Sequence, residues 1–203
     1  MKTVVKFFIL ILFSLNTIPT FSQENPEIAK INSEKLKYEQ KLKSIIASGD
    51  FSIPGVTVIF NYVIGDHMSD NQEDKSTMIK SNKEIHNLIP DGTEYSSYNY
   101  ILKDEKGIIR FISTEESSEA VSTEFIYFND KGNTVYYCSE TNMDWFDSKR
   151  IYYFDTSGKQ IKSKNICHEN DESGKSKVVK CEPIFCPKSV TEVLQSKKLK
   201  SAL

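Results

Sequence analysis

The side chains best suited to proton transfer in this chain are three histidines, His67, His86 and His168. Imidazole ordinarily titrates close to neutral pH, so a histidine beside a nucleophile or a carboxylate is the usual mark of a catalytic site. These three are scattered along the sequence. Cys167 directly precedes His168, but neighbouring residues on a strand point to opposite faces of the sheet. We therefore predict no Cys–His catalytic pair and no catalytic residue from this set.

Two pairs of acidic residues could supply the carboxylates of a glycosidase: Glu115 with Glu116, and Asp144 with Asp147. Such an enzyme needs two carboxyl groups about 5–9 Å apart across a cleft. Glu115 and Glu116 lie in "STEESSEAVSTE", a segment whose Ser, Thr and Glu content predicts a solvated connector. An enzyme is therefore not the favoured class, although a hydrolase whose site these patterns do not reveal is kept as a third alternative.

The segment "HENDESGK" resembles the start of a calcium-binding loop, with Glu169, Asp171 and Ser173 as ligands and Gly174 at the sixth position. The twelfth position of an EF-hand loop supplies a bidentate glutamate. Here that position holds Lys180, whose charge would repel the ion. We predict no metal site and no cofactor.

Four cysteines, Cys138, Cys167, Cys181 and Cys186, make an even number, which in an exported chain favours disulfides. A turn centred on Gly174 would place Cys167 and Cys181 opposite each other on an antiparallel pair, within reach of a disulfide. Cys138 would then be left for Cys186. A local Cys181–Cys186 bridge is the rival, and a zinc site that includes the adjacent histidine is the third possibility, although the spacing matches no usual finger.

Aromatic residues gather in the second half of the chain, where the pairs Tyr136–Tyr137 and Tyr152–Tyr153 place tyrosine on both faces of a predicted sheet. In one interpretation, helices and loops cover both faces. In the other, one face is an open aromatic platform for a protein, peptide or glycan. Trp145 stands in a predicted loop, "NMDWFDSK", and is the best candidate for a binding hot spot.

The first 22 residues have the layout of a secretory signal peptide rather than of a folded element. Lys2 and Lys6 precede an apolar stretch over 7–15, which is too short to span a bilayer as a helix. Thr20 and Ser22 are small residues that suit cleavage before Gln23. No later segment is apolar enough to cross a membrane, so we expect a secreted or periplasmic protein.

The mature chain of 203 − 22 = 181 residues has the length of one domain with a real core. Loss of Lys2 and Lys6 leaves 24 basic against 28 acidic residues, a net charge of −4. The charge is uneven: residues 104–147 hold ten acids and three bases, and residues 174–203 hold seven lysines and two glutamates. The protein lacks the broadly basic character of a nucleic-acid-binding domain. The basic tail is expected to be a solvated face or to dock on the acidic middle.

Regular elements must position these residues. Apolar residues at helical spacing predict an amphipathic helix over 27–48, with Asn25 as its cap, Pro26 as a favourable first residue and Gly49 at its end. "VTVIFNYVI", residues 56–64, predicts a strand covered on both faces. A polar loop is expected to follow it over 65–76. "CPKSVTEVLQSKKLKSAL" predicts a closing helix that begins near Pro187.

Between these elements, three hairpins follow one another, with turns over 104–107, 129–132 and 155–158. Each turn opens with Asp or Asn, whose side chain can cap it, and ends with glycine, which supplies the positive φ. Gly107, Gly132 and Gly158 are 25 and 26 residues apart, a period that predicts two strands per unit and an antiparallel meander.

The hairpin units resemble those of YD-repeat proteins and of MORN-variant, antitoxin-like proteins from Bacteroidota. The similarity rests on "YFNDKGN" at 127–133 and "YYFDTSGKQI" at 152–161 and covers about residues 95–164. The resemblance implies a hairpin architecture and carries no activity with it.

The sequence thus predicts an α+β fold with an N-terminal amphipathic helix, an antiparallel β-meander sheet over about 95–182 and a C-terminal helix. Residues 1–22 form the signal peptide and 23–203 a single domain. The favoured function is a non-enzymatic binding module with an aromatic sheet face that carries Trp145, Tyr136, Tyr137, Tyr152 and Tyr153. The alternative is an immunity- or inhibitor-type protein that binds a basic toxin or enzyme through the acidic middle.

The signal peptide gives the first prediction. Protein recovered from the medium or the periplasm of its host should begin at Gln23, because the small residues Thr20 and Ser22 suit the signal peptidase. Mass spectrometry of the intact chain checks this. Recovery of exported protein that still begins with Met1 would contradict cleavage.

Overall fold

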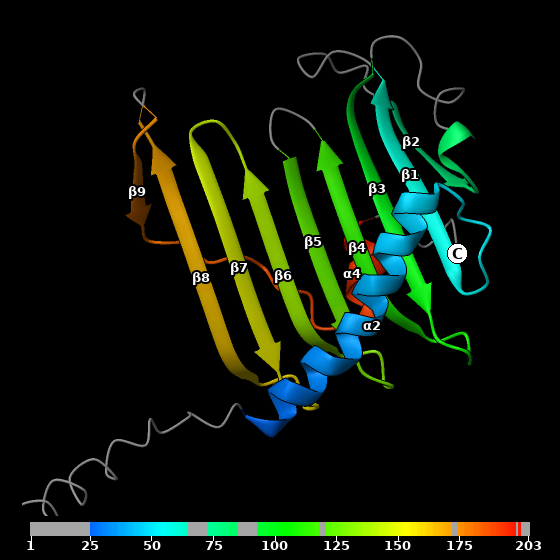
Figure 1. Cartoon of the computed structure of the whole chain (residues 1–203), viewed down its shortest axis with the longest axis horizontal. Coiled ribbons are helices and arrows are strands. Elements are labelled where there is room, and N and C mark those ends of the chain that lie inside the picture. The colour runs from blue at the N-terminus through cyan, green and yellow to red at the C-terminus, as the bar shows by residue number, and fades with distance from the viewer. Residues whose placement is uncertain are drawn as a thin grey trace, which may run out of the picture.

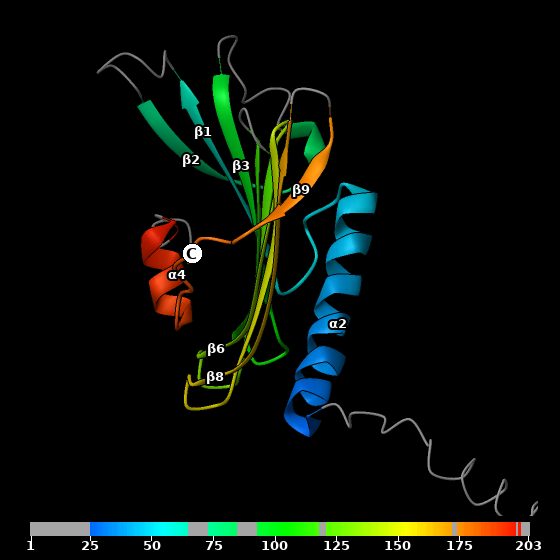
Figure 2. The ribbon, with the colours of Figure 1, turned by 90° about the vertical axis from the view of Figure 1, so that its left-hand side faces the viewer.

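A computed structural model describes residues 25–64, 73–84, 93–117, 121–171, 174–197 and 199. The proposed signal peptide and the closing residues of the chain lie outside this set. The described chain forms one antiparallel sheet with a helix packed on each face (Figures 1 and 2).

The helices and strands follow one another as a meander with one exception near the start. In chain order they are α2 (Pro26–Ser48), β1 (Val56–Ile64), β2 (Glu73–Ile79), β3 (Thr93–Lys103), β4 (Ile109–Ser117), β5 (Val121–Phe128), β6 (Thr134–Asn142), β7 (Phe146–Phe154), β8 (Gln160–Asn170), β9 (Ser176–Val179) and α4 (Val190–Ser196). The nine strands lie in the order β2-β1-β3-β4-β5-β6-β7-β8-β9, so β3 pairs with β1 and not with β2. The predicted helix–meander–helix order is confirmed, and strands make up most of the described secondary structure.

The predicted turns form as expected, and their chemistry explains the repeated sequence. In the turn between β3 and β4, Asp104 Oδ1 accepts hydrogen bonds from the backbone N–H groups of Lys106 at 2.9 Å and Ile108 at 3.0 Å. Gly107 follows with φ of +76°, a conformation that costs glycine little and other residues much. The same arrangement recurs at three further turns, which begin at Asn129, Asp155 and Asp171.

Each face of the sheet carries one hydrophobic cluster. On one face, α2 contributes Ile31, Tyr38, Leu42 and Ile45, which pack on sheet residues that include Val58, Phe60, Leu102, Phe111, Tyr127 and Tyr136. On the other face, α4 and the segment before it pack on Ile59, Ile101, Ile112, Ile126, Phe128 and Tyr137. Figure 2 shows the two helices on opposite sides of the sheet. β1 is buried from both sides, as its apolar sequence predicts.

α2 begins and ends where the sequence indicates. Asn25 Oδ1 accepts the N–H of Glu27 at 2.9 Å, and Gly49 adopts the left-handed conformation that ends the helix. Polar contacts then fix the helix on the sheet: the Tyr127 hydroxyl donates to Glu34 Oε2 at 2.8 Å, and the Tyr153 hydroxyl donates to Asn32 Oδ1 at 3.0 Å. None of the described helices is both long and apolar enough to cross a bilayer.

The C-terminal helix is shorter than predicted. It begins at Val190 rather than near Pro187, because Ser189 is its cap and accepts the N–H of Glu192 at 3.3 Å. The preceding residues 180–188 run in an extended path behind the sheet (Figure 1). We call this segment the strap.

The basic tail shows both outcomes that the charge pattern allows: Lys197 docks on the acidic middle, whereas Lys175, Lys177 and Lys180 are exposed. Lys197 Nζ lies 2.6 Å from Glu124 Oε2 and 3.8 Å from Glu116 Oε1. Glu124 also accepts the Tyr137 hydroxyl at 2.6 Å. These contacts hold the end of α4 against β4, β5 and β6.

Two segments expected to be loops are strands. Residues 73–76 were predicted to end a polar loop, but they begin β2, which among the described strands pairs with β1 alone. An edge strand such as β2 tolerates charged residues, because their side chains can remain in water. Glu115 and Glu116 were predicted in a connector, yet they belong to β4 and pair with Thr123 and Ser122 of β5. Alternating side chains send these two carboxylates to opposite faces, so they do not form a glycosidase pair.

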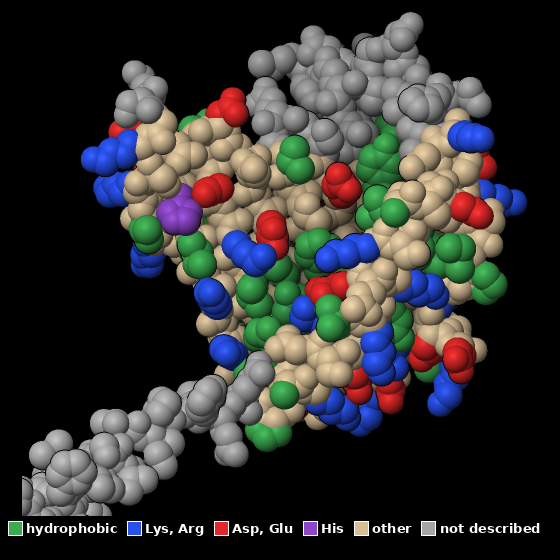
Figure 3. All heavy atoms as spheres, viewed as in Figure 1, with side chains coloured by type: hydrophobic (Ala, Val, Ile, Leu, Met, Phe, Trp, Pro, Cys, Tyr) green, Lys and Arg blue, Asp and Glu red, His purple; other side chains and the backbone are tan. Residues whose placement is uncertain are grey.

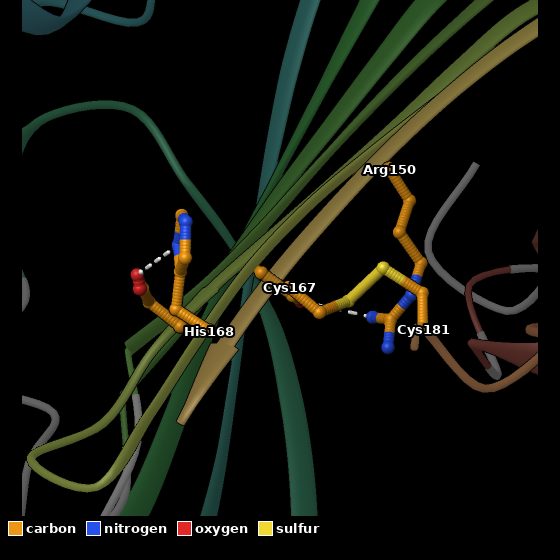
Figure 4. The surroundings of a disulfide bond; sticks show 6 residues. Arg150, Cys167, His168 and Cys181 are labelled. Atoms are coloured by element: carbon orange, nitrogen blue, oxygen red, sulfur yellow. Dashed lines mark hydrogen bonds and ion pairs between the residues drawn. A yellow bond between two sulfur atoms is a disulfide. The ribbon is translucent and has the colours of Figure 1, made fainter. Parts of the chain in front are cut away.

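The predicted disulfide between Cys167 and Cys181 is confirmed, with a Cα–Cα distance of 5.4 Å (Figure 4). The expected register is wrong. Cys167 pairs with Val179, because the turn that begins at Asp171 is centred one residue earlier than Gly174. Cys181 therefore lies beyond the end of β9 and anchors the start of the strap.

The second predicted disulfide, Cys138 with Cys186, is wrong, and so is its local rival Cys181–Cys186, because both Cys138 and Cys186 are free thiols. Cys138 packs in the cluster under α2 and Cys186 in the cluster on the other face, so the sheet separates them. Burial raises the pKa of each thiol to about 11.

These thiols give the second prediction. Native protein treated with iodoacetamide at about pH 8 should retain two unmodified thiols, because the raised pKa lowers the thiolate fraction about a hundredfold relative to an ordinary thiol. Denaturation without reductant should expose both to rapid alkylation. Peptide mapping should then find Cys167 linked to Cys181. Rapid labelling of native Cys138 would contradict its burial.

Candidate binding surface

α2 leaves one part of its sheet face uncovered, at the ends of β5, β6, β7 and β8. Residues paired across neighbouring strands share a face, so the register defines rows that run across the sheet. The row that contains Phe125, Cys138 and Ile151 belongs to the hydrophobic cluster under α2. Two further rows continue the same face beyond that cluster: Thr123, Glu140, Lys149 and Ile166, and then Val121, Asn142, Asp147 and His168.

These two rows line a shallow hollow with a volume of about 690 Å³. Figure 3 shows this face, with the histidine beside acidic, basic and apolar side chains and with α2 crossing the sheet elsewhere. Two apolar residues of the hollow, Val121 and Ile166, are exposed. The hollow therefore combines small apolar patches with charged and amide side chains, as open recognition surfaces do.

Ion pairs set the charge of the hollow. Lys149 Nζ pairs with Glu140 Oε1, and this hydrogen bond raises the pKa of the Lys149 ammonium. The Cys138 thiol, in the hydrophobic cluster under α2, donates to Glu140 Oε1 at 3.7 Å. Glu140 thus links the core under α2 to the open rows.

His168 and Asp147 form the second pair. His168 Nδ1 lies 3.1 Å from Asp147 Oδ2, an arrangement that fixes the imidazole ring and turns Nε2 away from the carboxylate (Figure 4). Asp147 Oδ1 is buried and has no hydrogen-bond partner in the described part of the chain. A buried carboxylate oxygen without a donor is costly, so Asp147 carries an unsatisfied polar atom beneath the hollow.

An oriented histidine could act as a general base, but it needs a nucleophile within hydrogen-bond reach. Thr123, Thr141 and Ser148 also line the hollow. Within the described ranges, no hydroxyl hydrogen bonds to His168, and Ser148 Oγ instead accepts a hydrogen bond from Arg150 Nη1 at 2.9 Å. Among the described residues, the hollow therefore holds no histidine hydrogen-bonded to a nucleophile.

Trp145 lies in the turn between β6 and β7, beside the hollow. The turn is closed by a hydrogen bond from Met143 N–H to the Phe146 carbonyl at 2.8 Å. The Asn170 N–H, from a residue that lines the hollow, donates to the Trp145 carbonyl at 2.9 Å. The Trp145 side chain is 65% exposed, as expected for a hot-spot candidate on a turn. Sequence reasoning found Trp145 but not the hollow, since it did not pair His168 with Asp147.

The four tyrosines predicted to join Trp145 on an open aromatic platform are packed instead. Tyr136 and Tyr137 are buried on opposite faces, the first under α2 and the second under α4. Tyr152 and Tyr153 are partly buried against the same two clusters. The helices thus cover the aromatic part of each face, which is the plainer of the two sequence interpretations.

The remaining candidates for chemistry give no second site. His67 and His86 lie outside the described residues. Asp171, which the rejected calcium-loop alignment would have used as a ligand, accepts the N–H of Lys175 at 3.0 Å through its carboxylate. No cluster of three or more potential metal ligands occurs among the described residues.

No family model, curated protein or solved structure matches this chain. The resemblance to YD-repeat and MORN-variant proteins therefore stays a prediction.

The exposure of Trp145 gives the third prediction. Trp145→Ala should change the free energy of unfolding by less than about 0.5 kcal/mol, because the side chain is largely in water. Tyr136→Ala, a buried control, should lower it by about 3–5 kcal/mol, the range for large buried aromatic side chains. Chemical denaturation measures both. A comparable loss in both variants would place Trp145 in the core.

Proposed function

We propose that this chain is an exported, non-enzymatic binding protein that recognises its partner through Trp145 and the adjoining hollow. The partner would be a protein, a peptide or a glycan. The observation that carries the proposal is the position of the exposed tryptophan beside the one part of the α2-side face that the described chain lines with both ion pairs and exposed apolar residues. A rigid aromatic side chain at the edge of a polar hollow supplies contact area at little entropic cost.

Three features support recognition rather than turnover. The hollow is broad and shallow, whereas active sites that exclude water are deep. Its hydrogen-bonding groups, which include Asn142, His168 and Asn170, are set on strands and therefore held in place. The buried thiol nearest to it, Cys138, has a raised pKa and is a poor nucleophile.

Export is part of the proposal. The confirmed disulfide supports it, because structural disulfides persist in oxidising compartments. The predicted signal peptide is the other support, and N-terminal sequencing of the exported protein tests it separately.

The inhibitor-type alternative receives less support from the charges. It requires the acidic middle to be available to a basic partner, whereas several of these acids are already paired. Glu124 contacts Lys197, Glu140 contacts Lys149, and Asp104 lies 3.5 Å from Arg110. The negative charge of this region is thus partly neutralised from within.

The fourth prediction uses the fact that the chain contains a single tryptophan. Titration of the mature protein with fractionated secretions, peptides or soluble glycans of its host should shift the emission of Trp145 to shorter wavelength, because a bound partner removes water from the indole. Trp145→Ala should weaken capture of that partner at least about tenfold. Capture is quantified by mass spectrometry of material retained on immobilised protein.

The matched control is Phe185→Ala. Phe185 is an aromatic side chain of similar exposure, at 71%, but it lies in the strap on the opposite face. Capture should be unchanged in this variant. Equal capture by wild type and Trp145→Ala, with no change in emission, would overturn the proposed surface.

A further inference from the structure

The sheet has an edge that its own chain leaves open. β8 runs from Gln160 to Asn170 and pairs with β7 along its length, but β9 pairs only with residues 167–170. Figure 1 shows β9 beside only the upper part of β8. Residues 160–166 therefore have no strand on their outer side in the described part of the chain. Unpaired backbone groups along an edge are a template for an added strand.

The hydrogen bonds at the end of β8 show which of its residues face outwards. The Asn170 N–H bonds towards β7, to the Trp145 carbonyl, and the Asp171 N–H bonds towards β9, to the Lys175 carbonyl. Backbone groups alternate sides along an antiparallel strand, so the odd-numbered residues point to the outer edge. Ser163 and Asn165 thus present their N–H and C=O groups there, and both residues are exposed.

Lysines surround this edge. Lys162 pairs with Tyr153 and Lys164 with Ile151, so both side chains lie on the α2-side face of the sheet. Residues 160–166 contain these two lysines and no acid. More lysines lie on the segments next to β8: Lys159 directly precedes it, and Lys175, Lys177 and Lys180 lie on or next to β9. Each of the six is exposed, and none forms an ion pair with another described residue.

The disulfide lies at the point where β9 stops covering β8. It ties Cys181 to Cys167, the last residue of β8 that β9 covers, so β9 ends there and the strap turns behind the sheet.

A second copy of the chain is a poor occupant of this edge. Antiparallel pairing of two β8 edges about Ser163 would place Lys162 opposite Lys164 of the other copy, and directly opposed like charges are destabilising.

We propose that the outer edge of β8, residues 160–166, binds one extended acidic peptide segment by strand addition. The backbone of the segment would pair with Ser163 and Asn165. Acidic side chains at alternate positions of the segment would lie beside Lys162 and Lys164, on the α2-side face of the sheet. The side chain of the residue between them would lie on the opposite face, beside that of Ser163. The recognised pattern is therefore acid–x–acid in an extended chain, with main-chain bonds for affinity and the lysines for specificity. This inference does not depend on the hollow or on Trp145.

The test uses the oxidised mature protein and a short synthetic peptide that alternates glutamate with valine, labelled with fluorescein. A peptide with lysine in place of each glutamate is its control. Anisotropy should show binding of the glutamate peptide that weakens at high salt, and no binding of the lysine peptide. Amide exchange followed by NMR should show slower exchange at Ser163 and Asn165 once the glutamate peptide is bound.

Two pairs of variants separate the backbone from the charges. Ser163→Pro removes the outward N–H and should weaken binding at least about tenfold, whereas Ser163→Ala should not. Proline is tolerated on the open side of an edge strand, and circular dichroism verifies folding. Lys162→Glu with Lys164→Glu should reverse the preference in favour of the lysine peptide. The matched double reversal at Lys37 and Lys43, both exposed on α2, should retain the preference for the glutamate peptide.

Failure to bind the glutamate peptide at millimolar concentration would overturn the proposal. Equal binding of both peptides, or no effect of folded Ser163→Pro, would do the same. Binding at the edge should leave the emission of Trp145 unchanged, because Trp145 lies beside Asn170 at the end of β8, whereas the peptide would pair with Ser163 and Asn165. The proposal for the edge and the proposal for the hollow can therefore be refuted independently of each other.

Discussion

The register of the hairpins is the constraint on which the rest of the structure depends. A slip of one residue in any strand would exchange its two faces, and this sheet has apolar side chains on both. The Asx residue and the glycine at each repeated turn fix that register locally, as Asp104 and Gly107 do between β3 and β4. Once the turns are set, side chains line up in rows across β5, β6, β7 and β8. The position of each row then decides whether it becomes core or surface.

The two helices determine which of these rows are buried and which stay accessible. α2 and α4 cover the aromatic rows, which become two cores on either side of one sheet. The rows beyond α2 carry Glu140, Lys149, Asp147 and His168 in place of large apolar residues, so they stay accessible and pair their charges with one another. In the proposed function, the partner would bind the rows that the helices leave uncovered. The tyrosines would stabilise the fold.

Local rules in the sequence were sufficient for much of the fold. The cap at Asn25, the end of α2 at Gly49, the extent of β1 and the repeated turns all follow from a few neighbouring residues. Burial of the tyrosines and the separation of Cys138 from Cys186 depend on which helix covers which face, and no local pattern encodes that. The pairing of Asp147 with His168 also eluded sequence reasoning, because it requires the exact register between β7 and β8. Trp145 was found because a tryptophan between turn residues is unusual on its own.

The docking of α2 also bears on how the protein forms. The helix is made before any strand, yet its hydroxyl contact at Asn32 comes from Tyr153, 121 residues later in the chain. Its apolar stripe has no complete partner until β6 and β7 have been synthesised and added to the growing sheet. Contacts between residues so far apart in the chain slow folding, and the apolar stripe of α2 stays exposed until they form. During biogenesis, α2 would therefore be the segment of the described chain in greatest need of a chaperone.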